Sequence, residues 1–258
     1  MSNIANAFKN GKAFIGFVTG GDPCLEKSEA YIHALLEGGA DLIEIGIPFS
    51  DPVAEGPVIQ AANIRSLKAG CTVEGIFGLV QKVRSKSSVP LVFLSYLNPV
   101  FRYGYDAFFA RCRDCGVDGI IIPDLPFEES GEVKPICQKY GVDLISLISP
   151  TSDERIKKIA LDADGFIYIV SSMGVTGIRD VIETNVGSLA GAARSSTKRP
   201  LAVGFGINTV EQAAHFCKIA DGVIVGSAIV KIIAEHGIDG DASNALREYV
   251  RNMKAAML

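Results

Sequence analysis

The chain has 258 residues, of which 48% are hydrophobic and 21% are charged, and its formal net charge at pH 7 is −4. This composition is typical of a soluble enzyme and excludes disorder as the main state, and the length suffices for one large core. The chain has no basic block that would indicate binding to nucleic acid or to an anionic membrane. It lacks the run of about 18 apolar residues that spans a bilayer, and residues 1–12 lack a signal-peptide core. We therefore expect a cytoplasmic protein.

The cysteines and histidines do not form a recognisable site. The six cysteines are scattered, which in a cytoplasmic chain of this size indicates reduced thiols in the core. Cys112 and Cys115 form a C-x-x-C motif, but the motif lies in a helical pattern, and no second Cys or His pair lies nearby to complete a zinc site. All three histidines fall within predicted helices or at their ends, which argues against a histidine-centred catalytic triad.

Short β-branched stretches alternate with amphipathic stretches along the chain. The predicted strands are residues 13–19, 42–46, 91–96, 119–122, 143–148, 166–170, 201–204 and 222–225. The predicted helices are residues 25–37, 58–69, 73–85, 105–115, 130–139, 153–161, 186–196, 209–218, 227–235 and 242–254, after a short amphipathic start at residues 4–9. Loops are expected around Asn98 and Pro99 and over residues 171–185.

This order of elements predicts an α/β fold. The strands are continuous apolar runs, as expected for parallel strands that are covered on both faces. No linker divides the chain, so we predict one domain, residues 1–258, that forms an eightfold β/α (TIM) barrel with extra helices at the N-terminus, in the loop after strand two and after strand eight. The alternative is an open doubly wound sheet, which normally has G-x-G-x-x-G after its first strand; the sequence there, Thr19-Gly-Gly-Asp-Pro, does not match.

Three acids lie at the end of the second predicted strand and in the loop after it: Glu44, Asp51 and Glu55. The active site of a β/α barrel lies at the carboxyl ends of its strands. Glu44 is part of the apolar stretch Leu-Ile-Glu-Ile-Gly, where burial would raise its pKa toward values useful for acid–base catalysis. The alternative is a structural acid paired with a loop donor. Spacing alone explains Asp51 and Glu55 equally well as ordinary turn and loop residues.

Two glycine-containing stretches predict a phosphate site. Residues 203–207 end the seventh predicted strand, and residues 225–231 end the eighth and open a short helix. Glycines allow close approach of the backbone, and the N-terminus of a helix supplies N–H donors. These two loops form the recurrent phosphate site of the barrel fold, so we predict a small phosphorylated ligand. Tyr96 and Tyr168 are candidate walls for an aromatic ligand, although packing within the barrel explains them equally well.

Seven stretches, taken together, resemble one family over essentially the whole chain: the alpha subunit of tryptophan synthase. They are residues 17–23, 44–60, 96–99, 123–126, 168–177, 204–207 and 225–231. The resemblance implies a lyase of tryptophan biosynthesis that cleaves indole-3-glycerol phosphate to indole and glyceraldehyde 3-phosphate by a retro-aldol reaction. It also implies no cofactor or metal in this subunit, and a pyridoxal-phosphate β subunit as partner in an αββα complex.

The resemblance assigns roles residue by residue. Glu44 matches the glutamate that moves protons, and Glu55 stands where the family typically has an aspartate that accepts the indole N–H. The positions that line the indole or support the glutamate are Phe17, Ile59, Leu94, Tyr96 and Tyr168, and those of the phosphate site are Gly177, Phe205, Gly206, Gly226 and Ser227. Thr176 matches a loop residue that contacts the second acid. Asp51 and Pro52 match positions near the β-subunit interface.

The sequence departs from the family pattern at two places. Glu55 adds one methylene group to the usual aspartate, and a displacement of about 1 Å can cost roughly a hundredfold in rate. Ser172 and Met173 replace a more common arginine-containing loop. Two alternative functions therefore remain open at this stage: a ligand-binding activator of the β subunit with weak lyase activity, and another phosphate-using barrel enzyme.

Overall fold

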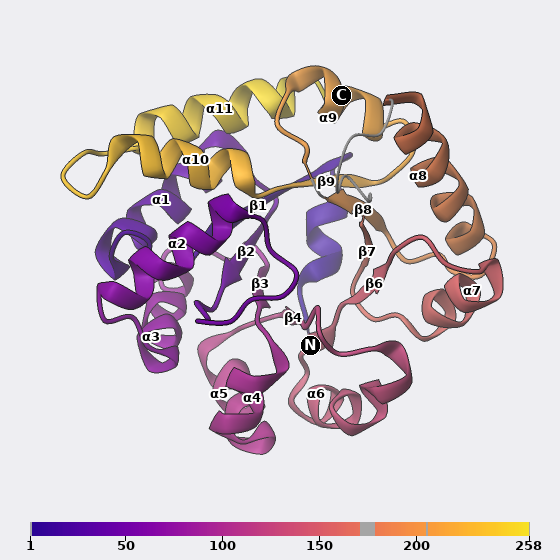
Figure 1. The fold of residues 1–258 in the computed structure, drawn as a ribbon, viewed down its shortest axis with the longest axis horizontal. Coiled ribbons are helices and arrows are strands. Elements are labelled where there is room, and N and C mark those ends of the chain that lie inside the picture. Colours follow the sequence, from indigo (N-terminus) through magenta and orange to yellow (C-terminus); the bar gives the residue numbers. More distant parts are fainter. Residues whose placement is uncertain (1, 171–178, 205, 258) are drawn as a thin grey trace.

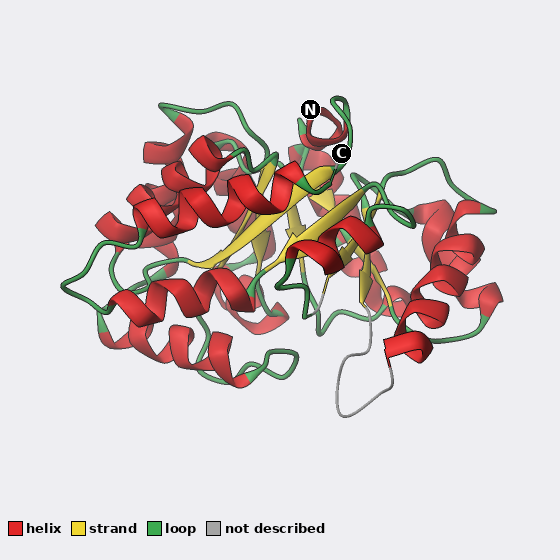
Figure 2. Ribbon diagram, turned by 90° about the horizontal axis from the view of Figure 1, so that it is seen from above, coloured by secondary structure: helices red, strands yellow, loops and turns green. Residues whose placement is uncertain are grey.

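The computed structural model describes residues 2–170, 179–204 and 206–257. The described chain forms a ring of parallel strands surrounded by helices (Figures 1 and 2). The strands are β1 (Ala13–Thr19), β2 (Leu42–Gly46), β3 (Leu91–Leu94), β4 (Gly119–Ile121), β5 (Asp143–Leu144), β6 (Ser146–Ile148), β7 (Ile167–Val170), β8 (Leu201–Gly204) and β9 (Gly222–Val225).

The ring closes at β5 and β6. The strands pair in the order β5-β4-β3-β2-β1-β9-β8-β7-β6, so these two strands stand at the two ends of the sheet. Only Ile145 separates them in the chain, and its N–H donates to the carbonyl of Ile120 at 2.9 Å. β5 and β6 therefore share one position, which pairs with β4 on one side and with β7 on the other. The predicted eightfold barrel is confirmed, and its fifth predicted strand is interrupted at Ile145.

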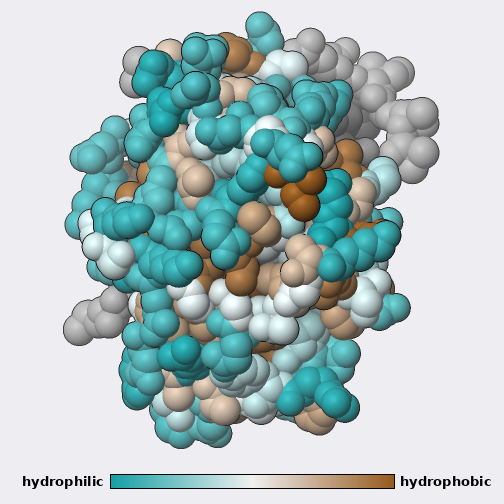
Figure 3. All heavy atoms as spheres, turned by 90° about the vertical axis from the view of Figure 1, so that its left-hand side faces the viewer, coloured by the Kyte–Doolittle hydropathy of each residue, from teal (hydrophilic) through white to brown (hydrophobic). Residues whose placement is uncertain are grey.

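Helices cover the outside of the ring, and a short 3-10 helix lies across one end of it (Figure 1). They are η1 (Ile4–Phe8), α1 (Leu25–Gly38), α2 (Pro57–Lys68), α3 (Val73–Arg84), α4 (Leu97–Tyr103), α5 (Tyr105–Cys115), η2 (Phe127–Glu132), α6 (Lys134–Tyr140), α7 (Asp153–Asp162), α8 (Arg179–Arg194), α9 (Val210–Phe216), α10 (Ser227–His236) and α11 (Ser243–Ala255). The face on the α1, α2 and α3 side is mainly hydrophilic, with separate apolar patches (Figure 3). Within the described residues, no helix is long and apolar enough to cross a membrane.

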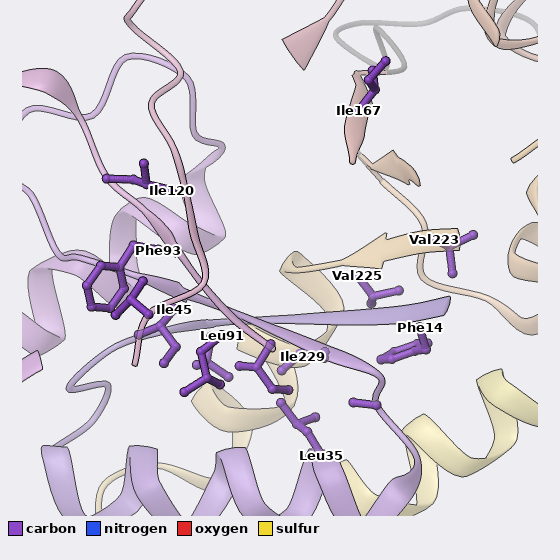
Figure 4. Packing of buried hydrophobic residues seen from close by; sticks show 14 of the residues in the cluster. Phe14, Leu35, Ile45, Leu91, Phe93, Ile120, Ile167, Val223, Val225 and Ile229 are labelled. Atoms are coloured by element: carbon purple, nitrogen blue, oxygen red, sulfur yellow. The ribbon is translucent and has the colours of Figure 1, made fainter. Parts of the chain in front are cut away.

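Two apolar layers explain why the strands read as continuous apolar runs. Successive side chains of a strand point to opposite faces, so residues such as Phe14, Ile45 and Phe93 pack between the strands and the helices (Figure 4). The alternate residues fill the barrel, and η1 closes its N-terminal end with Ile4. The interior layer comprises Ala13, Ile15, Leu42, Val92, Ile121, Ile145, Phe166, Tyr168, Ala202 and Ile224. Burying both faces of each strand is the main source of stability in this arrangement.

The structure corrects three sequence predictions. The expected loop around Asn98 and Pro99 is helix α4, because Asp124 accepts the N–H of Leu97 at 2.9 Å and Pro99 lies in the first turn, where no intrahelical N–H is needed. The helix expected at residues 130–139 is divided into η2 and α6, because Pro135 has no N–H to continue a helix. Helix α8 starts at Arg179, within the expected loop at residues 171–185, and residues 179–185 contain no glycine or proline that would break a helix.

Aspartates tie the strands together at the N-terminal end of the barrel. Each of three aspartates accepts the backbone N–H of the first or second residue of a neighbouring strand and also contacts a cationic side chain. Asp118, which is 5% exposed, accepts from Leu91 at 2.9 Å and from the guanidinium of Arg84 at 2.7 Å. The other sets are Asp41 with Phe14 and Lys254, and Asp221 with Leu201 and Arg194.

Candidate active site

Glu44 points into the barrel from the middle of β2. It lies beside Phe17 of β1 and Val92 of β3 in the strand register and is 1% exposed. Its Oε1 atom is buried and has no hydrogen-bond partner in the described part of the chain. Burial in these apolar surroundings raises the pKa of Glu44 to about 8. At neutral pH the carboxyl is therefore mainly protonated and can act as an acid.

A cavity of about 400 Å³ opens at the C-terminal end of the barrel beside Glu44. It has a second carboxyl group, that of Glu55, in its wall, while most of the other lining is apolar. The lining residues are Phe17, Glu44, Ala54, Glu55, Gly56, Pro57, Ile59, Leu94, Tyr168, Gly206, Ile224, Gly226 and Ser227. The structure thus brings together nine of the residues named from the sequence. An apolar cavity with a few polar groups is typical of a site for a small, partly aromatic ligand.

Two glycines make room for the aromatic walls of this cavity. A side chain at Gly46 would place its Cβ 2.8 Å from the ring of Phe17, and one at Gly204 would overlap the ring and hydroxyl of Tyr168. Burial raises the pKa of the Tyr168 hydroxyl well above its ordinary value, and the nearby Glu44 charge adds to this. Tyr168 is therefore a neutral wall of the cavity at any physiological pH.

The loop between β2 and α2 is held by three hydrogen bonds around Glu55. The Ala54 N–H donates to the Tyr96 hydroxyl at 3.0 Å, and Gln60 Nε2 donates to the Glu55 carbonyl at 2.8 Å. Asn63 Nδ2 donates to Glu55 Oε2 at 2.5 Å. Burial raises the pKa of Glu55, and the hydrogen bond from Asn63 opposes this. Sequence reasoning missed Asn63; the available signal was a polar residue next to the apolar face of a predicted helix.

Tyr96 stands behind the loop and outside the cavity lining. It is 1% exposed, and its ring packs on Phe49 with 5.5 Å between the ring centroids. Burial raises its pKa to about 12, so the hydroxyl stays neutral where it accepts the Ala54 N–H. Tyr96 thus supports the loop that carries Glu55.

Helix α2 is fixed to the end of β1. The guanidinium of Arg65 donates two hydrogen bonds to Asp22, at 2.8 and 2.7 Å, and Asp22 is 1% exposed. The hydroxyl of Ser66, which is fully buried, donates to the Gly20 carbonyl at 2.6 Å. Paired contacts of an arginine with a carboxylate are strong and directional, so α2 has a fixed position relative to the barrel.

The predicted phosphate residues that the structure describes lie at one side of the cavity. Gly226 precedes the first residue of α10, Ser227, and both line the cavity with Gly206. No side chain among the described residues caps the N-terminus of α10, whose first N–H groups can bind an anion. Three further site residues named from the sequence, Thr176, Gly177 and Phe205, lie outside the described residues.

The described residues contain no group of three or more His, Cys, Asp or Glu side chains that could hold a metal ion. Cys112 and Cys115 are free thiols buried on α5. Burial raises the pKa of both thiols, which keeps them protonated and inert. The C-x-x-C motif is therefore part of the core.

Comparisons with known proteins show the family of this chain. The family model of the tryptophan synthase alpha chain matches residues 4–258. The alpha chain of Lactiplantibacillus plantarum is 50% identical over 258 residues, covering 100% of this chain and 97% of that one, and that of Lacticaseibacillus casei is 49% identical over 257 residues, covering 100% and 96%. The crystal structure of tryptophan synthase subunit alpha from Legionella pneumophila str. Paris has a TM-score of 0.90 and 36% identity, covering 100% of this chain and 98% of that one. This chain therefore belongs to the tryptophan synthase alpha chain family.

Proposed function

We propose that Glu44 and Glu55 carry out the retro-aldol cleavage of indole-3-glycerol phosphate in the cavity at the C-terminal end of the barrel. As a member of its family, the chain is a lyase of tryptophan biosynthesis. The observation that carries the residue assignment is the Glu44 carboxyl, which is buried, has one oxygen without a partner among the described residues and has a pKa raised to about 8. A group with such a pKa both gives and takes a proton near neutral pH.

The proposed reaction needs only these two carboxyl groups. Protonated Glu44 gives its proton to indole C3, which makes the ring a positively charged indoleninium ion. The bond between C3 and the glycerol chain then breaks, its electron pair restores the indole, and the 3′-hydroxyl becomes an aldehyde as its proton passes to Glu44. Glu55, ionised, accepts the indole N–H and stabilises the positive charge. The ring itself takes up the electron pair, so we propose no cofactor or metal in this subunit.

The remaining cavity residues bind the substrate in this proposal. Apolar side chains from β1, α2, β3 and β7 contact the indole ring, and backbone N–H groups at the start of α10 hold the phosphate. The indole-contacting residues are Phe17, Ile59, Leu94 and Tyr168, supported by Tyr96, and the phosphate-binding residues are Gly177, Phe205, Gly206, Gly226 and Ser227. Thr176 contacts Glu55 when substrate is bound.

We further propose that a pyridoxal-phosphate β subunit receives the indole, in a cytoplasmic αββα complex. Two exposed apolar residues support a docking surface: Val53, which precedes the cavity residue Ala54, is 78% exposed, and Phe101 of α4 is 64% exposed. Asp51 and Pro52 belong to the same loop as Val53 and would contact the partner. Burying isolated apolar side chains of this kind is favourable in a complex.

The test of the proposed chemistry is the variant Glu44→Gln, which keeps the shape of the side chain and removes its proton chemistry. We expect indole formation to fall by about a thousandfold, both for the chain alone and with a β subunit. Binding of indole propanol phosphate, a substrate analogue that cannot be cleaved, should persist in the variant. Turnover at the wild-type rate would contradict the role of Glu44.

One observation favours a second function, that of a ligand-binding activator of the β subunit with weak lyase activity. Glu55 has one methylene group more than the family's usual aspartate, and its carboxylate is held by Asn63. Absence of cleavage by the wild-type chain, with and without a β subunit, together with activation of that subunit, would favour this function. The third hypothesis, another phosphate-using barrel enzyme, does not fit the family match.

A further inference from the structure

We propose that Asn63 is a positioning residue that aims the carboxylate of Glu55, and that it thereby adapts this site to a glutamate. The proposal rests on the proposed function of Glu55. It concerns how the second acid is held, whereas the preceding proposal concerns what both acids do.

The first argument is the contact itself. Asn63 is 3% exposed and lies on the inner side of α2, and its Nδ2 atom is 2.5 Å from Glu55 Oε2. Glu55 belongs to a loop, and a glutamate side chain has three rotatable bonds, so it needs an external contact to stay in one conformation. Gln60 and Tyr96 contact only backbone atoms, namely the Glu55 carbonyl and the Ala54 N–H. Among the described residues, Asn63 alone donates a hydrogen bond to the Glu55 carboxylate.

The second argument is that Asn63 itself has a fixed position. The next two residues of α2 after Ile64 are Arg65, paired with buried Asp22, and Ser66, bonded to the Gly20 carbonyl. Both partners follow β1, the strand that carries Phe17 into the cavity. Because α2 is rigidly attached to the end of β1, the amide of Asn63 fixes the position of the Glu55 carboxylate relative to the ring of Phe17.

The third argument is the chemistry of the donor. A carboxylate that is to stabilise a positively charged ring must stay ionised and must keep one oxygen for the ligand. The neutral amide of Asn63 hydrogen-bonds one oxygen, Oε2, and favours the ionised form. A lysine or arginine at position 63 would form an ion pair and cancel the charge that the ring needs. The pairing of a glutamate with a neutral, buried donor thus fits a role in catalysis.

The experiment combines Asn63→Ala, Asn63→Asp and Glu55→Asp with the double variant Glu55→Asp/Asn63→Ala. We expect Asn63→Ala to lower kcat/KM about tenfold to a hundredfold, mainly through kcat, and to move the acid limb of the pH profile to higher pH. Asn63→Asp keeps the size of the side chain and adds a like charge, so the acid limb should move further. Ile64→Ala, at the exposed neighbouring position on α2, is the matched control. It should change neither kcat/KM nor the acid limb of the pH profile.

The double variant separates a positioning role from a structural one. If Asn63 only stabilised the fold, removing its amide would lower kcat/KM equally whether position 55 holds glutamate or aspartate. An aspartate at position 55 is one methylene group shorter and no longer reaches Asn63, so removing the amide should then cost less than about threefold. Equal losses in both backgrounds, with an unmoved acid limb, would overturn the proposal. Loss of folding by Asn63→Ala is detected by urea denaturation, and Asn63→Asp then provides the test. If wild type does not cleave the substrate, or Glu44→Gln does, the proposed function fails instead.

Discussion

At the N-terminal end of the barrel, Asp118 accepts hydrogen bonds from the Leu91 backbone and the Arg84 guanidinium. Toward the C-terminal end, Glu44 has an oxygen without a hydrogen-bond partner among the described residues. Both carboxyl groups are at least 95% buried, being 5% and 1% exposed. Burial disfavours a charged carboxylate unless hydrogen bonds and an opposite charge replace water. Asp118 has such partners at the N-terminal end, whereas Glu44 Oε1 has none among the described residues.

This difference separates carboxyl groups that stabilise the fold from those that perform chemistry. A paired carboxylate joins the start of a strand to a cationic side chain. An unpaired one keeps its proton to higher pH, and the structure must tolerate its unsatisfied oxygen. Glu55 is intermediate, because burial raises its pKa while one neutral donor opposes the rise. Three sets of substitutions and one pH profile test this contrast.

Glu44→Gln should stabilise the fold at alkaline pH. The folded pKa of about 8 lies above the ordinary value of 4.5, so the contribution of Glu44 is fully present below pH 4.5 and is lost as pH rises through about 8. Glutamine does not ionise, so the variant avoids this loss, which is at most about 5 kcal/mol. Urea denaturation at about pH 6 and about pH 9 measures the difference. If the variant's gain in the free energy of unfolding is no larger at about pH 9 than at about pH 6, ionisation of Glu44 does not destabilise the fold.

Asp118→Ala should destabilise the fold by about 3 kcal/mol, because it removes the buried ion pair with Arg84 and leaves the Leu91 N–H without its acceptor. Asp221→Ala is the matched change at a position where the side chain is 35% exposed, and it should cost only about 1 kcal/mol. Urea denaturation gives both values, and kcat per folded molecule should not change. A large loss of kcat in folded Asp118→Ala would mean that the two ends are not independent.

Gly204→Ala should cost about 1 to 3 kcal/mol and also lower kcat, because the new methyl group overlaps Tyr168 and displaces this wall of the cavity. The matched control is Gly78→Ala in α3, where no atom lies within 4 Å of the added carbon. That change should stabilise the helix by about 0.5 to 1 kcal/mol. Thermal denaturation and steady-state assays compare the two variants. Similar behaviour of both would show that Tyr168 moves away without cost.

The pH profile of kcat/KM should be bell-shaped. Activity falls above about pH 8 as Glu44 loses its proton, by about tenfold for each further pH unit. It falls on the acid side as Glu55, whose pKa burial raises above 4.5, becomes protonated. Steady-state rates over a series of buffers measure both limbs. An alkaline limb that persists in a slow but measurable Glu44→Gln variant would assign that limb to another group.

The sequence allowed the barrel to be predicted because local and global signals agree in β1, β2, β8 and β9, where each apolar run coincides with a strand. The predicted loop around Asn98 and Pro99 was wrong because the first N–H of α4 is satisfied by Asp124, which lies in a distant loop. For the site, Glu44 was identified because a single acid interrupts an apolar strand. Asn63 and the contact of Tyr96 with Ala54 were missed because each depends on packing against the β2–α2 loop, which spacing along the chain does not reveal.

The interruption at Ile145 has a consequence for ligand binding. The ring is held shut there by short strands, two residue pairs between β5 and β4 and three between β6 and β7. One of those pairs joins Leu147 to Tyr168, which lines the cavity. Breathing of the barrel at this closure therefore displaces a wall of the cavity. Amide hydrogen exchange at Ile145, which does not itself line the cavity, should slow when a ligand fills it.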